Sequence, residues 1–100
     1  MKNAYLYSII ARNGKLTPFE KAVLYKTMEV KRGSTVTYAK LAELVGNRKA
    51  SRAVGNALNK NPLPLLVPCH RVVSSSGIGG YKYGRLAKRM LLGIEKLTSR

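Results

Sequence analysis

The segment TYAKLAELVGNRKASRAVGNALNK, residues 37–60, has the pattern of two short helices joined by a tight turn. Thr37 is a suitable N-cap for the first helix, and Gly46 is suited to end it. The second helix is predicted over residues 49–60, and its small and apolar residues recur at i, i+3, i+4, i+7 and i+8. That spacing places on one buried face Ala50, Ala53, Val54, Ala57 and Leu58. The segment therefore predicts a helix-turn-helix.

The opposite face of the second helix is polar and basic, and it includes Lys49, Ser51, Arg52 and Asn56. Small residues such as Ala50 would let this helix approach a partner backbone closely. Such a surface favours DNA binding. The alternative is an ordinary helical hairpin, since many hairpins of this form bind nothing.

The overall charge agrees with a polyanionic partner. The 100 residues include 19 Lys and Arg but only 4 Asp and Glu, which gives a formal net charge of +15. A positive potential over so small a domain favours nucleic acid. A basic protein that is merely soluble, or that docks on acidic proteins, remains the alternative. At 45% hydrophobic residues the chain is expected to fold as one domain over residues 1–100.

The flanking segments predict a mainly α fold. The apolar run Ala4–Ala11 predicts a strand followed by a turn, and it is too short for a signal peptide or a membrane span. A helix is predicted over residues 18–30, and a very short strand at residues 35–36. A last helix over residues 85–97 is expected to turn inward Leu86, Met90, Ile94 and Leu97. We therefore expect a winged-helix-like bundle of about four helices with a small N-terminal β element.

The segment LVPCHRVV, residues 66–73, contains the only cysteine and the only histidine of the chain, Cys69 and His70. A thiol becomes a good nucleophile when a base takes its proton, and histidine is a suitable base. Neighbours in an extended chain point to opposite faces, so His70 reaches Cys69 only through a bend or a bridging water. The alternatives are a small buried hydrophobe at Cys69 and a structural histidine at His70.

The cysteine count also bears on redox state and metals. One cysteine cannot form an internal disulfide, so we expect an intracellular, reducing compartment. One Cys and one His do not supply a metal site, and no cofactor is implied.

The wider sequence resembles the C-terminal, active domain of the O-6-alkylguanine-DNA alkyltransferases, also called methylated-DNA–protein-cysteine methyltransferases. The resemblance extends from about Thr17 to Glu95, and PCHRVV, preceded by NPLP and by KASRAVGNAL, is its most specific part. It implies direct, irreversible transfer of an alkyl group from the guanine oxygen to Cys69, once per molecule and without a cofactor. The implied partner is double-stranded DNA bound by a monomer, with the target base flipped out through the minor groove.

The resemblance also implies roles for individual residues. His70 is the base acting through a water, Glu95 orients His70, and Tyr38 helps to rotate the nucleotide and donates a hydrogen bond to the guanine ring. Arg52 is the finger that replaces the extruded base, and Asn61 is the hinge between the helix-turn-helix and the active-site loop. The guanine pocket is implied to include Pro64, Val72, Tyr81 and Lys82, with the Val72 carbonyl accepting from the exocyclic amine.

The sequence departs from this family in two ways. Most members carry an N-terminal domain of RNase H-like fold, whereas only about sixteen residues precede Thr17 here. Lys82 occupies a position that is usually serine, which affects the expected substrate range. Two other functions remain open: a lesion-binding protein of this family that does not accept the alkyl group, and a plain basic helix-turn-helix protein.

Overall fold

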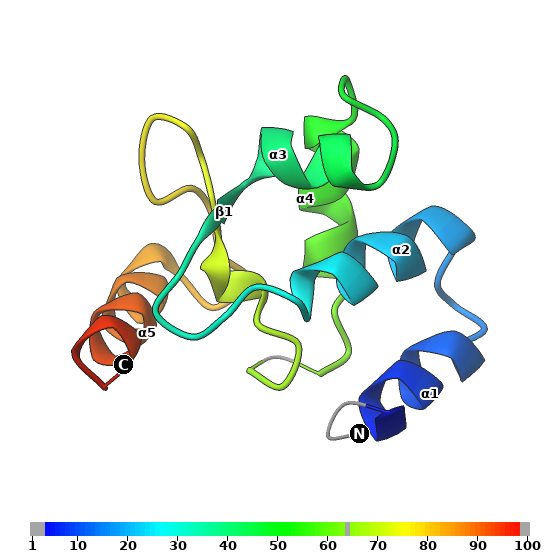
Figure 1. Cartoon of the computed structure of the whole chain (residues 1–100), viewed down its shortest axis with the longest axis horizontal. Coiled ribbons are helices and arrows are strands. Elements are labelled where there is room, and N and C mark those ends of the chain that lie inside the picture. Colours follow the sequence, from blue (N-terminus) through cyan, green and yellow to red (C-terminus); the bar gives the residue numbers. More distant parts are fainter. Residues whose placement is uncertain (1–3, 64, 99–100) are drawn as a thin grey trace.

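The computed structural model describes residues 4–63 and 65–98, and within them the fold is mainly helical (Figure 1). Five α-helices, a 3₁₀ turn and two short strands follow in the order α1 Ala4–Arg12, α2 Pro18–Thr27, β1 Val36–Thr37, α3 Tyr38–Leu44, α4 Ser51–Asn59, η1 Cys69–Arg71, β2 Val72–Val73 and α5 Arg85–Thr98. None of the helices in this part of the chain is long and apolar enough to cross a bilayer.

The predicted helix-turn-helix is confirmed as α3 and α4, which pack on each other and on α2. Thr37 caps α3, because its hydroxyl accepts a hydrogen bond from the Lys40 amide at 3.0 Å. Gly46 adopts a φ of +88° after α3, a conformation that favours glycine. The apolar face of α4 is buried at Val54, Ala57 and Leu58, but Ala53 is exposed, contrary to prediction.

The two strands form a parallel pair that joins distant parts of the sequence. Val36 pairs with Val72, and Thr37 pairs with Val73. The predicted short strand is thus present, shifted by one residue. Since η1 ends where β2 begins and α3 begins where β1 ends, this pairing holds the Cys69–His70 turn beside the N-terminus of α3.

The N-terminal segment is a helix, so the predicted strand and N-terminal β element were wrong. A short apolar run does not distinguish a strand from a buried helix by periodicity. In α1, Ile10 is fully buried, and the ring of Tyr7 lies 5.3 Å from that of Tyr25 in α2. Packing against α2 therefore accounts for the helical form of this segment.

Helix α2 begins as the sequence predicts and ends earlier. Its capping box is complete: Thr17 and Glu20 each accept a hydrogen bond from the other's backbone amide. The helix ends at Thr27, about three residues before the predicted end, and the chain continues in turns to Val30. Val23 and Leu24 are fully buried in the core that α2 shares with α3 and α4.

Helix α5 lies as predicted along the sequence but is rotated about its axis relative to the prediction. The four residues expected to point inward are exposed by 51% or more: Leu86, Met90, Ile94 and Leu97. The buried residues of α5 are instead Lys88 and Glu95. Leu65 and Leu66 are exposed as well. An apolar hollow of about 480 Å³ results, lined by Leu65, Tyr81, Tyr83, Ala87, Met90, Leu91 and Ile94.

Candidate active site beside the helix-turn-helix

A cleft of about 680 Å³ opens between the helix-turn-helix and the active-site loop. It is lined by Tyr38, Ser51, Arg52, Gly55, Leu58, Asn59, Cys69, Gly80, Tyr81 and Lys82. Six of these ten were predicted as site residues from the sequence, whereas Gly55, Leu58, Asn59 and Gly80 were not. The only thiol of the chain and the polar face of α4 therefore border the same cavity.

The Cys69–His70 pair lies on a bend rather than in an extended segment. Residues Cys69–Arg71 form the 3₁₀ turn η1, which leads directly into β2. Cys69 is 7% exposed and borders the cleft, while His70 is 1% exposed and lies behind it. A bend is thus present at this pair, which is one of the two routes by which His70 could reach Cys69, the other being a bridging water.

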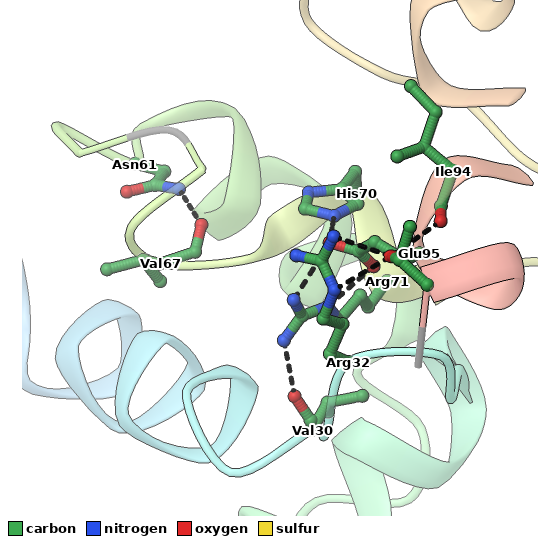
Figure 2. A network of polar contacts seen from close by, with 9 residues as sticks. Val30, Arg32, Asn61, Val67, His70, Arg71, Ile94 and Glu95 are labelled. Atoms are coloured by element: carbon green, nitrogen blue, oxygen red, sulfur yellow. Dashed lines mark hydrogen bonds and ion pairs between the residues drawn. The ribbon is translucent and has the colours of Figure 1, made fainter. Parts of the chain in front are cut away.

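A buried polar network holds His70 from behind (Figure 2). His70 Nε2 lies 2.8 Å from Glu95 Oε2, so the predicted His70–Glu95 contact is present. Arg71 donates two hydrogen bonds to the same carboxylate, from Nε to Oε1 at 2.9 Å and from Nη2 to Oε2 at 2.8 Å. Burial alone would raise the pKa of Glu95, but hydrogen bonds from Arg71 and His70 outweigh it and lower that pKa to about 2. Glu95 is thus ionised at neutral pH.

The other ring nitrogen of His70, Nδ1, is buried and has no hydrogen-bond partner among the described residues. An ionised carboxylate can only accept hydrogen bonds, so Nε2 carries the proton shared with Glu95. In neutral His70, Nδ1 then has a free lone pair. An unpaired buried nitrogen is costly unless a water or a substrate group reaches it. His70 is thereby prepared to accept a proton at Nδ1.

Tyr38 borders the cleft, and the loop that contains Gly79 and Gly80 packs closely on it. Its hydroxyl donates to the Gly80 carbonyl at 3.2 Å. Gly79 has a φ of +78°, and a Cβ there would lie only 2.9 Å from Tyr38 Cε2, so this approach requires glycine. Burial, assisted by the nearby Cys69, raises the pKa of Tyr38. The hydroxyl therefore keeps its proton at neutral pH and remains a donor.

Lys88 is a component of the site to which the sequence analysis gave no role. It is fully buried, and its ammonium donates to the carbonyls of Val72, at 2.5 Å, and Gly80, at 2.9 Å. No carboxylate among the described residues pairs with it. Burial lowers the pKa of Lys88 to about 8, although the nearby Cys69 opposes this. Its spacing of two helical turns from Glu95 was the available signal, since it places both on one face of α5.

The remaining predicted residues lie around the cleft at different depths. Arg52 is exposed and borders the cleft. Lys49 and Asn56 are exposed and Ala50 is half-buried, and none of these three borders the cleft. Ser51 and Asn56 lie on α4, and Lys49 and Ala50 immediately precede it.

Asn61 and the other pocket residues occupy definite positions. Asn61 is buried, donates to the Val67 carbonyl and accepts from the Leu63 amide, both at 2.9 Å, so it ties the end of α4 to the following loop. Tyr81 and Lys82 line the cleft. Val72 is buried behind it, with its carbonyl accepting from Lys88. Pro64 lies outside the described residues.

Fold and site together define a helix-turn-helix protein with a thiol at the base of its cleft, and comparison with known proteins identifies its family. The family model described as "6-O-methylguanine DNA methyltransferase, DNA binding domain" matches residues 18–97. The chain belongs to this family. It is 48% identical over 82 residues to a probable methylated-DNA–protein-cysteine methyltransferase of Acanthamoeba polyphaga mimivirus, covering 82% of this chain and 55% of the viral protein. It is 51% identical over 79 residues to the human methyltransferase, covering 77% of this chain and 38% of the human one.

Solved structures agree with the fold. A Mycobacterium tuberculosis OGT in complex with DNA superimposes with a TM-score of 0.80 at 39% identity, over 83% of this chain and 52% of that one. Schizosaccharomyces pombe Atl1, in complex with damaged DNA containing O6-carboxymethylguanine, gives a TM-score of 0.71 at 28% identity, over 81% and 78%. The chain spans about half the length of the curated relatives it matches.

Proposed function

We propose that this protein repairs DNA by moving the alkyl group of O6-alkylguanine onto its own Cys69, irreversibly and once per molecule. The observation that carries this proposal is the cleft that Cys69 shares with Tyr38 and Arg52, backed by the His70–Glu95 contact. Membership of the methyltransferase family supports it. So does the likeness to relatives whose structures were solved in complex with DNA.

The reaction requires two proton transfers: one from the Cys69 thiol before it attacks, and one to the guanine as it leaves. His70 Nδ1 takes the thiol proton through a water, and the resulting thiolate attacks the alkyl carbon. A carbon–sulfur bond forms as the carbon–oxygen bond breaks, and the guanine leaves with the bonding electrons. The Tyr38 hydroxyl donates a proton to the departing ring, so that a neutral guanine is released. Overall, one proton passes from the protein to guanine as the alkyl group passes to sulfur.

The alkylated oxygen is inside the duplex, so the nucleotide must first be flipped out, at a cost of a few kcal/mol. Arg52, which is exposed and borders the cleft, fills the gap in the base stack. Helix α4 lies in the minor groove, where phosphates are contacted by Lys49, Ser51 and Asn56. The small side chain of Ala50 lets the helix approach the DNA backbone closely. The net charge of +15 offsets the cost of extrusion through sequence-independent affinity.

The flipped guanine is held by residues of β2 and of the loop between β2 and α5. Tyr81 and Lys82 border the base, and the Val72 carbonyl accepts from the exocyclic amine. A carbonyl oxygen has two lone pairs, so Val72 can serve Lys88 and the base together. Asn61 acts as a hinge that couples α4 to the loop that follows it. Lys82 borders the cleft at the position where the family usually has serine.

Intact-mass spectrometry after incubation with a duplex containing O6-methylguanine tests the reaction. The expected result is one added methyl per protein, located by peptide mapping at Cys69, with none in Cys69→Ser. A folded wild-type protein that binds the duplex and gains no methyl would overturn the proposal and favour a lesion-binding protein.

The flipping step needs a separate control. Arg52→Ala is expected to slow transfer from duplex DNA far more than transfer from free O6-benzylguanine, because only the duplex requires extrusion. Equal losses on both substrates would remove Arg52 from the flipping step.

A further inference from the structure

We propose that Arg71 is a positioning residue that acts through Glu95 to hold the His70 ring with Nε2 toward the carboxylate and Nδ1 free. This inference rests on the proposed function for its consequence in catalysis, but the contacts that carry it are independent of the reaction. Arg71 is the residue after His70 in η1, and its guanidinium lies directly against the carboxylate that His70 uses (Figure 2).

The guanidinium of Arg71 joins three parts of the fold. Its Nε and Nη2 bind both oxygens of Glu95 on α5, and its Nη1 donates to the Val30 carbonyl, after α2, at 2.8 Å. The side chain of Arg71 is 14% exposed and that of Glu95 8%, so water screens this ion pair little. Only the planar fork of arginine has donors in the directions that these three acceptors require.

The carboxylate that Arg71 holds is the one that sets the state of His70. Glu95 Oε2 accepts from Arg71 Nη2 and from His70 Nε2, each at 2.8 Å. A mobile Glu95 would let the imidazole rotate or change tautomer, and the proton could then lie on Nδ1. Held by Arg71, Glu95 accepts from Nε2 and leaves Nδ1 bare.

The single histidine makes the test unambiguous, because one imidazole gives one set of ring signals. Two-bond ¹H–¹⁵N correlation spectra of wild type at neutral pH are expected to show a protonated Nε2 and a bare Nδ1. Arg71→Lys keeps the charge but loses the fork, and its spectrum is expected to move toward mixed tautomers. Its methyl transfer should fall about tenfold to a hundredfold, which is less than the roughly 10²–10⁴-fold that a general base contributes, because His70 itself is still present.

Arg32→Lys is the matched control. Arg32 also reaches α5, through two hydrogen bonds to Thr98 Oγ1, but it does not contact Glu95. This variant is expected to keep both the wild-type ring signals and the wild-type rate. A double variant of Arg71→Lys with Glu95→Gln should be no slower than Glu95→Gln alone, because Arg71 acts through Glu95.

The outcomes separate this inference from the proposed function. A folded Arg71→Lys protein with wild-type His70 signals overturns the inference, whatever the transfer activity. Changed signals with an unchanged rate of methyl transfer overturn its catalytic consequence. If wild type transfers no methyl group, the proposed function fails, while the NMR comparison still decides whether Arg71 fixes His70.

Discussion

Helices α4 and α5 are both amphipathic, but they turn different kinds of face toward the body of the molecule. Helix α4 buries Val54, Ala57 and Leu58 and leaves its polar face to the cleft and solvent. Helix α5 buries Lys88 and Glu95, while its stripe of large apolar side chains is exposed. Hydrophobic burial therefore positions α4, whereas hydrogen bonds from two charged side chains position α5.

This difference follows from what each helix must contact. The partners of α4 are the apolar faces of α2 and α3, which favour burial of methyl groups. The partners of α5 are His70 and Arg71, together with the carbonyls of Val72 and Gly80. Orienting those groups requires a carboxylate and an ammonium on the inner face. Helix α5 therefore forgoes apolar burial and supplies polar contacts to the site.

Of the variants that test this comparison, Glu95→Gln should have the largest effect on stability. A neutral amide leaves the nearly buried guanidinium of Arg71 without its counter-ion, so we expect a loss of about 3 kcal/mol at pH 7. The folded-state pKa of about 2 lies below the ordinary value of 4.5. The stability contributed by ionised Glu95 is therefore fully present above about pH 4.5 and is lost as the pH falls toward 2.

Urea unfolding of wild type and Glu95→Gln at pH 7 and pH 3 measures both effects. The gap between the two proteins should narrow at pH 3. Glu43→Gln is the control, because Glu43 is half exposed and pairs only with Lys40, and a change below about 0.5 kcal/mol is expected. A gap that stays constant with pH would contradict the assignment of this stability to ionised Glu95.

Val54→Ala tests the other helix and should have the next largest effect. Val54 is fully buried in the core, and removal of its methyl groups is expected to cost about 2 kcal/mol. Leu97→Ala removes more atoms from α5, yet Leu97 is 87% exposed and a change below about 0.5 kcal/mol is expected. Equal losses in thermal or urea unfolding would contradict the distinction between the two helices.

The same rule of periodicity succeeded at α4 and failed at α5 for a physical reason. Hydropathy ranks residues by their cost of transfer from water, and the partners of α4 are apolar, so that cost decides which face is buried. Lys88 is expensive to bury, but its hydrogen bonds go to the carbonyls of Val72 and Gly80. Backbone carbonyls leave no signature in the sequence, so the spacing of Lys88 from Glu95 could indicate its face of α5 but not its acceptors.

The candidate site was predictable where residue type and neighbours decide the chemistry. PCHRVV led to Cys69 and His70, and resemblance to the family led to Glu95, whose contact with His70 is present. Arg71 stood within the quoted motif but was given no role, because its three acceptors come from segments far apart in the sequence. The N-terminal helix was missed because its packing against α2 decides its form.

Lys88→Met should have a smaller, pH-dependent effect. The folded-state pKa of Lys88 is about 8, below the ordinary value of 10.5. Between these values the unfolded chain holds a proton that the folded chain has released, so the Lys88 contribution makes stability rise with pH. The stability of Lys88→Met should not show this rise. The variant also leaves the Val72 and Gly80 carbonyls without the Lys88 donor, so its free energy of unfolding at pH 7 should be lower than that of wild type by about 1 kcal/mol.

Urea unfolding at pH 7, 8.5 and 10 measures this contribution. Wild type should gain stability relative to Lys88→Met as the pH rises, whereas the exposed Lys15→Met should follow wild type at every pH. Parallel curves for wild type and Lys88→Met would show that the buried amine does not titrate in this interval.

The smallest effect on stability is expected for the exposed stripe of α5, altered in the double variant Met90→Gln/Ile94→Gln. Their side chains are 57% and 51% exposed and border the apolar hollow, so replacing them should change the free energy of unfolding by less than about 0.5 kcal/mol each. Binding of a hydrophobic dye such as ANS should fall, because the variant removes part of the exposed apolar surface. A loss above about 2 kcal/mol would mean that this stripe is buried.

Methyl transfer by the same double variant should be unchanged, since the stripe lies on the face of α5 opposite Lys88 and Glu95. A selective loss of transfer would instead couple the hollow to the cleft through their shared residue Tyr81.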